Sequence, residues 1–458
     1  MKKFYLTTAI DYVNNLPHIG HAYEKIAADV LARYWRSKKI KVLFQTGTDE
    51  HGLKIAKAAK KSPAEFVSQM VSKFEQSWKN LDISYDNFVR TTNPGHQKKV
   101  QDYLIKLQKA RVIYRGVYSG FYCIGCEEYK TESELEQGRC PIHKKTCEKV
   151  SEAVYFFQLS KYQKQIYEII KSGKLKIEPE SRCNEVLSFL KKEKLKDIAI
   201  SRSRVSWGIP LPWDKKHTIY VWVDALFNYL TGNHSQEYWP ADLHIIGKDI
   251  IRFHGIIWPA MLLALKLPLP KKIFAHGYLT VSGEKMSKSL GNVIDPDKLV
   301  EKYGADAVRY FLLREFSFGA DGDFSLARLE ERYRADLAND LGNLVQRVLK
   351  MVQKYHVKII AKNNQGLTGV EKDIENLKFK TALDKIWDIV ITANQKIDQA
   401  EPWNIAKKDP KKLAQFLNQM VSRIILVANT LAPFMPETSK EISIQVQTLK
   451  IKPIFAKK

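Results

Sequence analysis

Residues 4–34 read FYLTTAIDYVNNLPHIGHAYEKIAADVLARY and contain the two elements that decide the fold. Phe4 to Ala9 is apolar and β-branched, which predicts a buried strand that runs into a loop. From Ile19 onward apolar residues recur at helical spacing, so a helix should begin at the motif His18-Ile19-Gly20-His21. Val42 to Gln45 predicts a second strand. Strand, loop, helix and strand is the order of a parallel doubly wound sheet, in which ligands bind where the strands end.

The rest of the chain predicts an interruption of this sheet, followed by a helical region. The regular order breaks between residues 116 and 200 and resumes with strand-like segments at Thr218–Val223 and Leu243–Ile246. After Phe324 we expect long amphipathic helices, and these fall at Ala327–Lys354, Thr381–Ala400 and Pro410–Ala432. We therefore predict an α/β fold, in which a Rossmann-type parallel doubly wound catalytic domain is split by an insertion and followed by an α-helical bundle domain.

The charge of the chain favours a polyanionic partner. Its 458 residues include 74 Lys and Arg against 50 Asp and Glu, a formal net charge of +24. Such an excess favours nucleic acid, although any single lysine doublet is as readily a solvated surface. The chain has neither an apolar run of transmembrane length nor the apolar core of a signal peptide. We therefore expect a soluble, cytoplasmic protein with no membrane partner.

The cysteines predict a metal site in a reducing compartment. Cys123-x2-Cys126 and Cys140-x2-His143 form two chelating pairs at a spacing that suits tetrahedral zinc. Four protein ligands would close the coordination sphere, so we expect one structural Zn²⁺ and not a catalytic ion. Redox use is the less favoured alternative, because the second pair is mixed and Cys147 is spare. Cys183 is most simply an inert residue.

Two short motifs predict a phosphate-binding site. His18 and His21 would place two donors beside the exposed backbone N–H groups of a helix start, where anions are stabilised. Residues 282–292, SGEKMSKSLGN, form a glycine-flanked polar loop whose Lys285 and Lys288 can bring ammonium groups onto phosphate oxygens. A histidine motif alone is more often a helix cap, and a lysine loop alone can be an exposed turn. Together they indicate two mostly cationic clusters that hold one polyphosphate.

This pairing resembles the signatures of class I aminoacyl-tRNA synthetases, and the surrounding residues resemble the methionyl-tRNA synthetase family most. The resemblance implies that ATP binds His18, Gly20, His21, Lys285 and Lys288, with Mg²⁺ accompanying the nucleotide. It implies that an amino-acid carboxylate attacks the α-phosphorus and that pyrophosphate leaves. The aminoacyl group then passes to the 2′-hydroxyl of the terminal adenosine of tRNA(Met), elongator and initiator alike.

The resemblance also implies a methionine pocket. Asp49 should hold the ammonium group, while Arg202 and Asp249 organise the adenylation site. The side-chain pocket is expected to be lined by Ile10, Tyr12, Trp222, Ala225, Leu226, Tyr229, Phe253 and His254. Without the resemblance, an apolar strand end with Trp and Tyr would read as core. Many relatives have proline where Ala9 stands and tyrosine where Asp11 stands, so the entry loop of the pocket should be less rigid here.

The helical end is expected to read the CAU anticodon. Asn343 and Arg347 lie four residues apart and share a helix face, and Trp403 follows Glu401-Pro402 at a helix start. Splayed RNA bases are recognised by aromatic stacking and by polar or guanidinium groups, and the resemblance places those roles on Asn343, Arg347 and Trp403. In isolation the same residues would be an exposed polar pair and a core tryptophan.

These assignments give a predicted domain order. The ranges are 1–115 and 201–275 for the two halves of the catalytic domain, 116–200 for the connective insertion with its zinc knuckle at 123–143, 276–326 for the lysine-loop and stem-contact region, and 327–458 for the anticodon-binding domain. The chain ends directly after the helical region, without an appended OB-fold, so we expect a monomer.

Three alternatives compete with this interpretation. A class I synthetase for leucine, isoleucine or valine usually carries a large editing domain, for which the insertion is too short, and the cysteine enzyme needs an open zinc position. A small nucleotidylyltransferase would share the histidine motif but would not explain the lysine loop or the helical end. A catalytically silent tRNA-binding paralogue is disfavoured because both signatures are intact.

Overall fold

The structure is a computed structural model that describes residues 2–59, 62–130, 132–141, 144–286, 291–360, 367 and 369–456. The chain forms two compact units. The first, which we call the sheet unit, comprises Met1–Pro17, Ile40–Gln76 and Tyr85–His276. The second, the helical unit, comprises His18–Lys39, Ser77–Ser84 and Gly277–Lys458. The predicted histidine motif therefore opens a segment of the helical unit.

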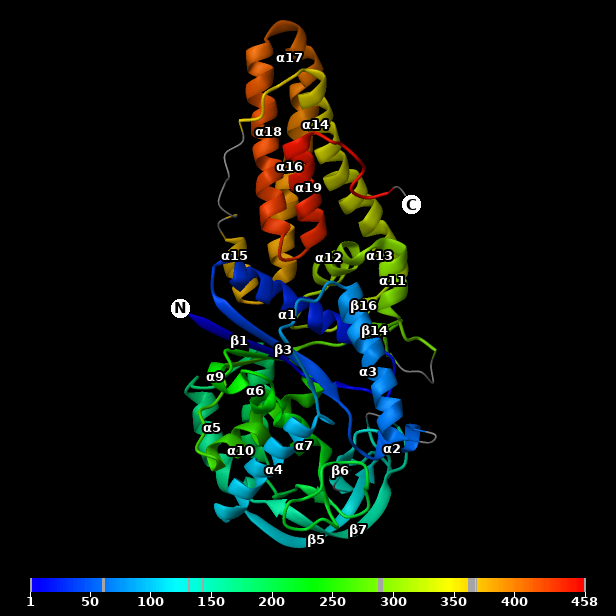
Figure 1. Cartoon of the computed structure of the whole chain (residues 1–458), viewed down its shortest axis with the longest axis vertical. Coiled ribbons are helices and arrows are strands. Elements are labelled where there is room, and N and C mark those ends of the chain that lie inside the picture. The colour runs from blue at the N-terminus through cyan, green and yellow to red at the C-terminus, as the bar shows by residue number, and fades with distance from the viewer. Residues whose placement is uncertain are drawn as a thin grey trace. The chain divides into compact units, whose positions relative to one another are not determined.

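A parallel seven-stranded sheet is the framework of the sheet unit (Figure 1). The path β4-β3-β1-β12-β13-β8 runs through it, and β2 continues beyond the end of β1 to pair with the end of β3. β1 lies between β3 and β12, so the strand order reverses there. This reversal is the switch point at which doubly wound sheets bind ligands, and it confirms the predicted α/β class. The strands are β1 (Lys3–Thr8), β2 (Asp11–Tyr12), β3 (Lys41–Asp49), β4 (Asn87–Arg90), β8 (Lys176–Glu178), β12 (Leu243–Gly247) and β13 (Lys272–His276).

The segment predicted as a strand at Thr218–Val223 is different in the structure. The strand β11 ends at Ile219 and pairs antiparallel with β10, outside the main sheet. A helix begins at Val221, because Tyr220 is extended and its carbonyl accepts from the N–H groups of Val223 and Asp224. That part of the prediction was wrong, since a short apolar run cannot distinguish a buried strand from a buried helix. Trp222 consequently lies on a helix.

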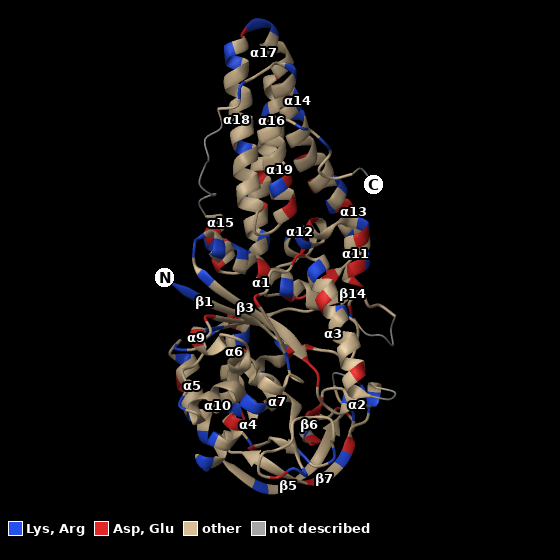
Figure 2. Cartoon of the chain, in the orientation of Figure 1, with Lys and Arg blue, Asp and Glu red and all other residues tan. Residues whose placement is uncertain are grey.

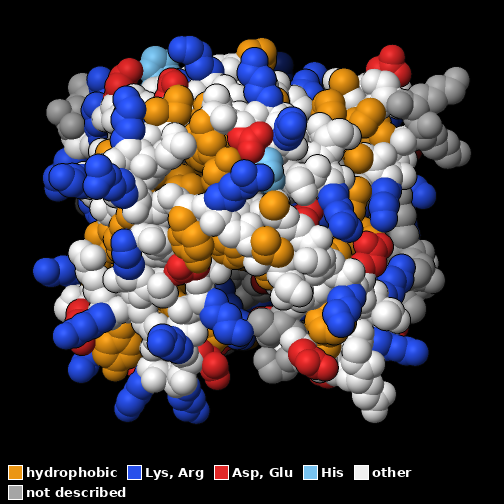
Figure 3. Space-filling view, turned by 90° about the horizontal axis from the view of Figure 1, so that it is seen from below, with side chains coloured by type: hydrophobic (Ala, Val, Ile, Leu, Met, Phe, Trp, Pro, Cys, Tyr) orange, Lys and Arg blue, Asp and Glu red, His pale blue; other side chains and the backbone are white. Residues whose placement is uncertain are grey.

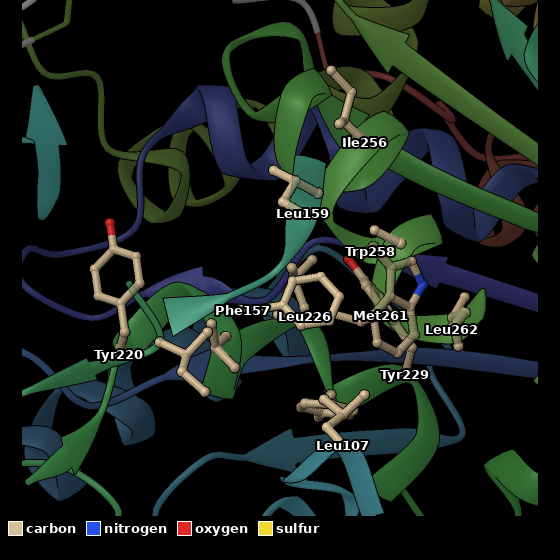
Figure 4. Packing of buried hydrophobic residues seen from close by; sticks show 14 of the residues in the cluster. Leu107, Phe157, Leu159, Tyr220, Leu226, Tyr229, Ile256, Trp258, Met261 and Leu262 are labelled. Atoms are coloured by element: carbon tan, nitrogen blue, oxygen red, sulfur yellow. The ribbon is translucent and has the colours of Figure 1, made fainter. Parts of the chain in front are cut away.

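The helices of the sheet unit are short, apart from α3 and α4. They are α2 (Leu53–Ala58), α3 (Pro63–Asn80), whose last turn enters the helical unit, α4 (Pro94–Lys109), α5 (Gln163–Lys171), α6 (Glu180–Lys192), α7 (Val221–Leu226), α8 (Asn228–Thr231), α9 (Ser235–Tyr238) and α10 (Trp258–Ala264), with the shorter turns η1 (Glu132–Glu134), η2 (Leu159–Tyr162), η3 (Lys248–Ile250) and η4 (Phe253–Ile257). Figure 4 shows how buried side chains from several of these elements pack. Trp258 and Met261 of α10 are fully buried there beside Tyr229 of α8. This core fixes the positions of the elements that carry the residues predicted to bind methionine.

The insertion has its own antiparallel sheet, in the order β6-β5-β7-β9. Its strands are β5 (Ile113–Cys123), β6 (Glu128–Lys130), β7 (Glu148–Phe157) and β9 (Ile198–Ala199), and β10 (Ser201–Arg202) and β11 (Thr218–Ile219) follow. The chain then returns to the main sheet before residue 200, which is earlier than the sequence predicted. Lys176 to Glu178 form β8, which pairs parallel with β13 at the edge. The segment 116–200 therefore contributes both a separate sheet and an edge strand.

The helical unit contains the bundle predicted after Phe324. Leu326 to Lys354 is one helical stretch that includes a π-helical segment, and helices at Phe379–Ala400 and Pro410–Leu431 match the expected ones. The elements are α1 (Ile19–Ser37), β14 (Leu279–Val281), β15 (Glu284–Lys285), α11 (Pro296–Tyr303), α12 (Ala305–Glu315), β16 (Gly322–Phe324), α13 (Leu326–Arg332), η6 (Tyr333–Gly342), α14 (Asn343–Lys354), α15 (Val370–Glu375), α16 (Phe379–Ala400), α17 (Pro402–Lys408), α18 (Pro410–Leu431) and α19 (Pro436–Thr448). Figure 1 shows α14, α16, α18 and α19 running alongside one another, with α17 at one end.

A buried ion pair joins α1 to this bundle. The Arg309 guanidinium lies 2.7 Å from the Asp29 carboxylate, and both side chains are fully buried. Arg309 also donates to the carbonyls of Pro433 and Phe434, which lie between α18 and α19. Burial acts to raise the pKa of Asp29, but Arg309 and Arg33 outweigh it and hold that pKa below its usual value. Breaking a buried pair of this kind is strongly destabilising, so α1 is firmly placed within the helical unit.

In the described part of the chain, no helix combines the length and the hydrophobicity that crossing a bilayer would require.

Candidate active site and metal centre

The two histidines of the first motif lie at the start of α1, as predicted. His18 is the N-cap, and its Nδ1 accepts from the Gly20 N–H at 3.1 Å. The His21 Nδ1 accepts from the His18 N–H at 3.2 Å, and the two rings stack with centroids 3.8 Å apart. A neutral imidazole that accepts at Nδ1 carries its proton on Nε2. Both rings therefore present an N–H donor at the start of the helix, whose first amides are held by the cap itself and by the Ile294 carbonyl.

These histidines are neutral in the free protein. Burial, and to a lesser degree Lys285, lowers the pKa of His18 to about 4. Burial also lowers the pKa of His21 well below its usual value, together with the charges of His18 and Lys25. The expectation of a mostly cationic cluster is thus wrong for the histidines, because the helix start removes them from water. Neutral imidazoles of this kind can donate hydrogen bonds but carry no charge.

The lysine motif begins on a hairpin of the same unit. Lys285 ends β15, and its ammonium lies 4.4 Å from the centre of the Tyr278 ring. A Cβ placed on Gly20 would come within 3.0 Å of the His18 ring and 3.4 Å of the Met286 methyl group, so glycine leaves the space that this approach requires. The Ile19 N–H also donates to the Ile294 carbonyl, beyond the loop. The structure therefore brings His18, Gly20, His21 and Lys285 together, whereas Lys288 lies outside the described residues.

The residues predicted for methionine gather in the sheet unit. Trp222 of α7 and Phe253 of η4 stack with centroids 4.1 Å apart. The Tyr229 hydroxyl lies 2.7 Å from Nε2 of His254, whose Nδ1 donates to the Ile250 carbonyl at 3.0 Å. One apolar cluster includes Leu226 and Tyr229 together with partly buried Tyr12, Trp222 and Phe253. Ala225 is buried, and Ile10 is half-buried in the short gap between β1 and β2.

Asp49 is a buried carboxylate at the end of β3, directly opposite Tyr12 of β2. Its Oδ1 has no hydrogen-bond partner among the described residues. Burial and the negative charges of Asp224, Glu127 and Glu50 raise the pKa of Asp49 well above its usual value. A group of carboxylates in low dielectric is stabilised by a cation, so this position suits a ligand ammonium.

Arg202 and Asp249 occupy different surroundings. Arg202 is buried, donates from Nε to Glu152 at 2.7 Å and lies over the Tyr122 ring at 3.9 Å. Its Nη1 has no partner among the described residues, so it can donate to a ligand. Asp249 is exposed in η3, directly after β12 and so at the carboxyl end of a central strand. No described contact joins these two residues.

The cysteine cluster fits a metal ion. The Sγ atoms of Cys123, Cys126 and Cys140 lie within 4.8 Å of one another, and Cys126 and Cys140 are 3.6 Å apart. A short turn holds Cys140, since its N–H donates to the Lys145 carbonyl. Thiolates at such separations suit tetrahedral zinc. His143 lies outside the described residues, and Cys147, expected to be spare, is buried in the same cluster as Cys123 and Cys140.

The predicted anticodon residues lie on two helices of the helical unit. Asn343 is exposed at the start of α14, and Arg347 lies one turn further along. The Arg347 guanidinium donates to Asp398 of α16 at 2.6 Å. Trp403 lies on α17 and is 45% exposed, which is unusual for so large an apolar side chain. Figure 2 shows Lys and Arg around this end of the bundle, where α17 ends in Lys407 and Lys408.

Sequence reasoning missed a buried network behind Asp49. Asp224 lies 2.7 Å from Nδ1 of His51 and 2.7 Å from Nε2 of His96. Burial acts to raise the pKa of Asp224, but the two histidines hold it below its usual value. Asp224 lies between the predicted pocket residues Trp222 and Ala225, and His51 lies two residues after Asp49, whereas His96 had no local signal. Glu127, which directly follows Cys126, was also missed, and its contacts are described below.

Comparison with known proteins identifies the class and then the family. Residues 4–152 and 131–349 match the family model of tRNA synthetases class I (M), and residues 350–453 match that of the anticodon binding domain of methionyl tRNA ligase. The fold and the paired motifs are thus those of a class I aminoacyl-tRNA synthetase.

Individual relatives narrow the amino-acid substrate of the family to methionine. The methionine–tRNA ligase of Caldanaerobacter subterraneus subsp. tengcongensis is 46% identical over 96% of this chain and 73% of its own length. That of a Nostoc species is 44% identical over 96% of this chain and 89% of its own. The structure of Mycobacterium tuberculosis methionyl-tRNA synthetase in complex with methionyl-adenylate matches with a TM-score of 0.94 and 36% identity, covering 100% of both chains. The chain belongs to the methionyl-tRNA synthetase family, and by that membership it is an aminoacyl-tRNA ligase.

Proposed function

We propose that this chain activates L-methionine with ATP and transfers it to tRNA(Met), elongator and initiator. The observation that carries the proposal is the helix start at which His18, His21 and Lys285 meet. It offers neutral imidazole donors, the positive end of a helix dipole and one ammonium group, a combination that binds a nucleotide triphosphate. Family membership and the aromatic pocket of the sheet unit supply the choice of methionine.

In the first step, a methionine carboxylate oxygen attacks the α-phosphorus and pyrophosphate leaves. The Nε2–H groups of His18 and His21 donate to phosphate oxygens, and Lys285 and Lys288 stabilise the charge that grows on the leaving pyrophosphate. Gly20 lets the nucleotide approach the helix start closely. Mg²⁺ enters with ATP as the counterion of its phosphates. The neutral histidines add donors to the site without adding positive charge.

Methionine selection rests on the sheet unit. The Asp49 carboxylate binds the ammonium group, because its Oδ1 is buried without a partner among the described residues. The unbranched, polarizable thioether lies against Tyr12, Trp222 and Phe253, since sulfur packs favourably on aromatic rings. Ile10, Ala225, Leu226, Tyr229 and His254 complete the pocket. Arg202, whose Nη1 has no partner in the described part of the chain, and Asp249 organise the adenylate.

The cysteine cluster holds one structural Zn²⁺. Cys123, Cys126 and Cys140 supply three thiolates, and we assign His143 as the fourth ligand. Zinc would stabilise the folded insertion, which has few apolar residues around these thiols. None of the five cysteines, all of them described, forms a disulfide, which supports a cytoplasmic location.

The helical unit binds the tRNA anticodon. Trp403 is exposed for base stacking, and Asn343 and Arg347 offer donors to base edges. Arg347 must leave Asp398 or share its guanidinium with a base. Residues 276–326 would contact the stem of the tRNA, and residues 116–200 form the connective insertion between the halves of the catalytic domain.

Exchange of labelled pyrophosphate into ATP, measured with each of the twenty amino acids, tests this function. We expect exchange with methionine alone, and its loss in Lys285→Ala and in His21→Ala. A matched control is Lys302→Ala, an exposed lysine of the helical unit that pairs with Glu330, and it should keep full exchange. Absence of exchange with any amino acid would refute the enzyme, and exchange with a different amino acid would refute the specificity.

A further inference from the structure

A single carboxylate of the insertion lies against the methionine pocket. Glu127 follows Cys126 in a tight turn, residues 124–127, which we call the cysteine turn. It has a left-handed backbone, with φ of 54°, and its N–H donates to the Ile124 carbonyl. Its side chain is only 4% exposed, although glutamate is rarely buried. A buried carboxylate in a strained turn has to be held by several donors.

Those donors come from the pocket and from the insertion. Oε1 of Glu127 accepts from the Tyr12 hydroxyl at 3.0 Å and from the backbone N–H of Lys54 at the start of α2. Oε2 accepts from the Tyr122 hydroxyl at 2.5 Å. A Cβ on Gly52, whose φ is +111°, would lie 2.9 Å from the Tyr12 oxygen and 3.0 Å from Oε1. Glycine is therefore required for this close approach.

The backbone of the cysteine turn also accepts a hydrogen bond from Trp222, which forms a second wall of the predicted methionine pocket. The Trp222 indole N–H donates to the Cys126 carbonyl at 3.2 Å. The Tyr220 hydroxyl, two residues earlier, donates to the Glu127 carbonyl at 2.6 Å. Tyr12 and Trp222 come from separate elements of the sheet unit, yet both are anchored on two consecutive residues, the thiol-bearing Cys126 and the adjoining Glu127.

We propose that Glu127 is a positioning residue for methionine binding, and that the cysteine turn couples the metal centre to the methionine pocket. The inference rests on the proposed function, because it takes Tyr12 and Trp222 as pocket walls. Glu127 does not contact the substrate. It fixes the Tyr12 phenol, while the thiolates of Cys123, directly before the turn, and Cys126, within it, hold the turn that carries Glu127. Methionine affinity should therefore depend on this carboxylate, whereas ATP affinity should not.

Steady-state pyrophosphate exchange tests the proposal, with methionine and ATP varied separately. In Glu127→Ala we expect the KM for methionine to rise about tenfold, with the KM for ATP within about twofold of wild type. Glu127→Gln keeps one carbonyl oxygen as a hydrogen-bond acceptor, so the KM for methionine should rise less in this variant than in Glu127→Ala. Glu136→Ala removes an exposed glutamate of the same insertion, which pairs with Lys144, and should leave both constants unchanged. Zinc content and thermal unfolding are measured on each variant.

Two further variants keep the test decisive if Glu127→Ala loses zinc or unfolds. Tyr12→Phe removes the same hydrogen bond from the opposite side, and Trp222→Phe removes the bond to the Cys126 carbonyl. Each should raise the KM for methionine selectively. Combining Tyr12→Phe with Glu127→Gln should have less effect than the product of the single changes, because one bond is shared.

The outcomes separate this inference from the proposed function. If wild type shows no exchange with methionine, the proposed function fails. If wild type exchanges normally, and the Glu127 and Tyr12 variants keep the wild-type KM for methionine or raise both KM values equally, the positioning role is overturned. Fully multiplicative effects in the double variant would also overturn it.

Discussion

His18 shows how one side chain acquires a defined chemical state from the element that contains it. Its Nδ1 caps α1, its ring stacks on His21, and burial lowers its pKa to about 4. Because Nδ1 already accepts a hydrogen bond, the remaining proton lies on Nε2. The sequence motif predicted the position of the ring, and the structure adds its charge and its tautomer.

This pKa predicts a pH-dependent stability. An unfolded histidine has a pKa near 6.5, so between about pH 6.5 and pH 4 the unfolded chain binds more protons than the folded one. The free energy of unfolding should therefore fall as the pH is lowered through this range, by up to about 3 kcal/mol from His18 alone. His18→Asn keeps a capping residue but cannot titrate, so urea unfolding of this variant should lose less stability on acidification.

The control for this prediction is His234→Asn, which changes an exposed histidine and should follow the wild-type pH dependence. Equal pH dependence in wild type and His18→Asn would contradict the assignment of a buried, neutral His18.

Among the elements, the sequence predicted best those with a strong local period. α1 and the bundle helices were found because their apolar residues recur at helical spacing over long stretches, whereas β1 and β3 were found from short apolar segments on either side of α1. Trp222 was placed on a strand and lies on a helix, because the run Thr218–Val223 is too short to show a period. β8 was not separated from the insertion, since three residues at a sheet edge carry almost no signal.

The functional residues divide in the same way into those with a local sequence pattern and those without one. Residues in motifs, such as His21 and Cys126, could be assigned from spacing or from resemblance. Glu127 and His96 could not, because their roles depend on side chains more than 70 residues away, including Tyr12 and Asp224. Contacts of this kind are fixed by tertiary packing and leave no pattern along the chain.

The insertion provides a prediction about the metal. Cys140→Ser should reduce the zinc content of the purified protein from about one ion per chain to well below half, and it should lower the unfolding temperature, because one thiolate of the converging set is lost. Cys183→Ser alters a cysteine of α6 outside the cluster and should keep the metal. Cys147→Ser should also keep it, since the proposed fourth ligand is His143. Retention of a full equivalent of zinc by Cys140→Ser would contradict this assignment.

At the scale of the whole molecule, charge and architecture both suit tRNA. The excess of 24 positive charges is spread widely, and Figure 3 shows Lys and Arg side chains scattered over one face with hydrophobic groups between them. Spread charge gives affinity for a phosphate backbone without sequence preference. Under the proposed function, specificity comes from exposed groups such as Trp403. The expected monomeric state stays a prediction, which sedimentation would check.

The exposed Trp403 side chain provides a prediction about tRNA binding. Trp403→Ala should raise the KM for tRNA(Met) between about fivefold and about 150-fold, because stacking of a base on an aromatic ring contributes about 1–3 kcal/mol. Pyrophosphate exchange, which needs no tRNA, should be unchanged. Trp403→Phe should restore most of the affinity. Ile444→Ala removes another exposed apolar side chain of the helical unit and should have no effect. A normal KM for tRNA in Trp403→Ala would exclude a role in anticodon binding.

Attachment of labelled methionine to a tRNA transcript tests directly whether this chain joins methionine to tRNA(Met). We expect ATP-dependent, acid-precipitable charging of a tRNA(Met) that carries the CAU anticodon. We also expect strongly reduced charging when that anticodon is replaced. No charging of tRNA(Met), or equal charging of a transcript with an unrelated anticodon, would contradict the proposed function.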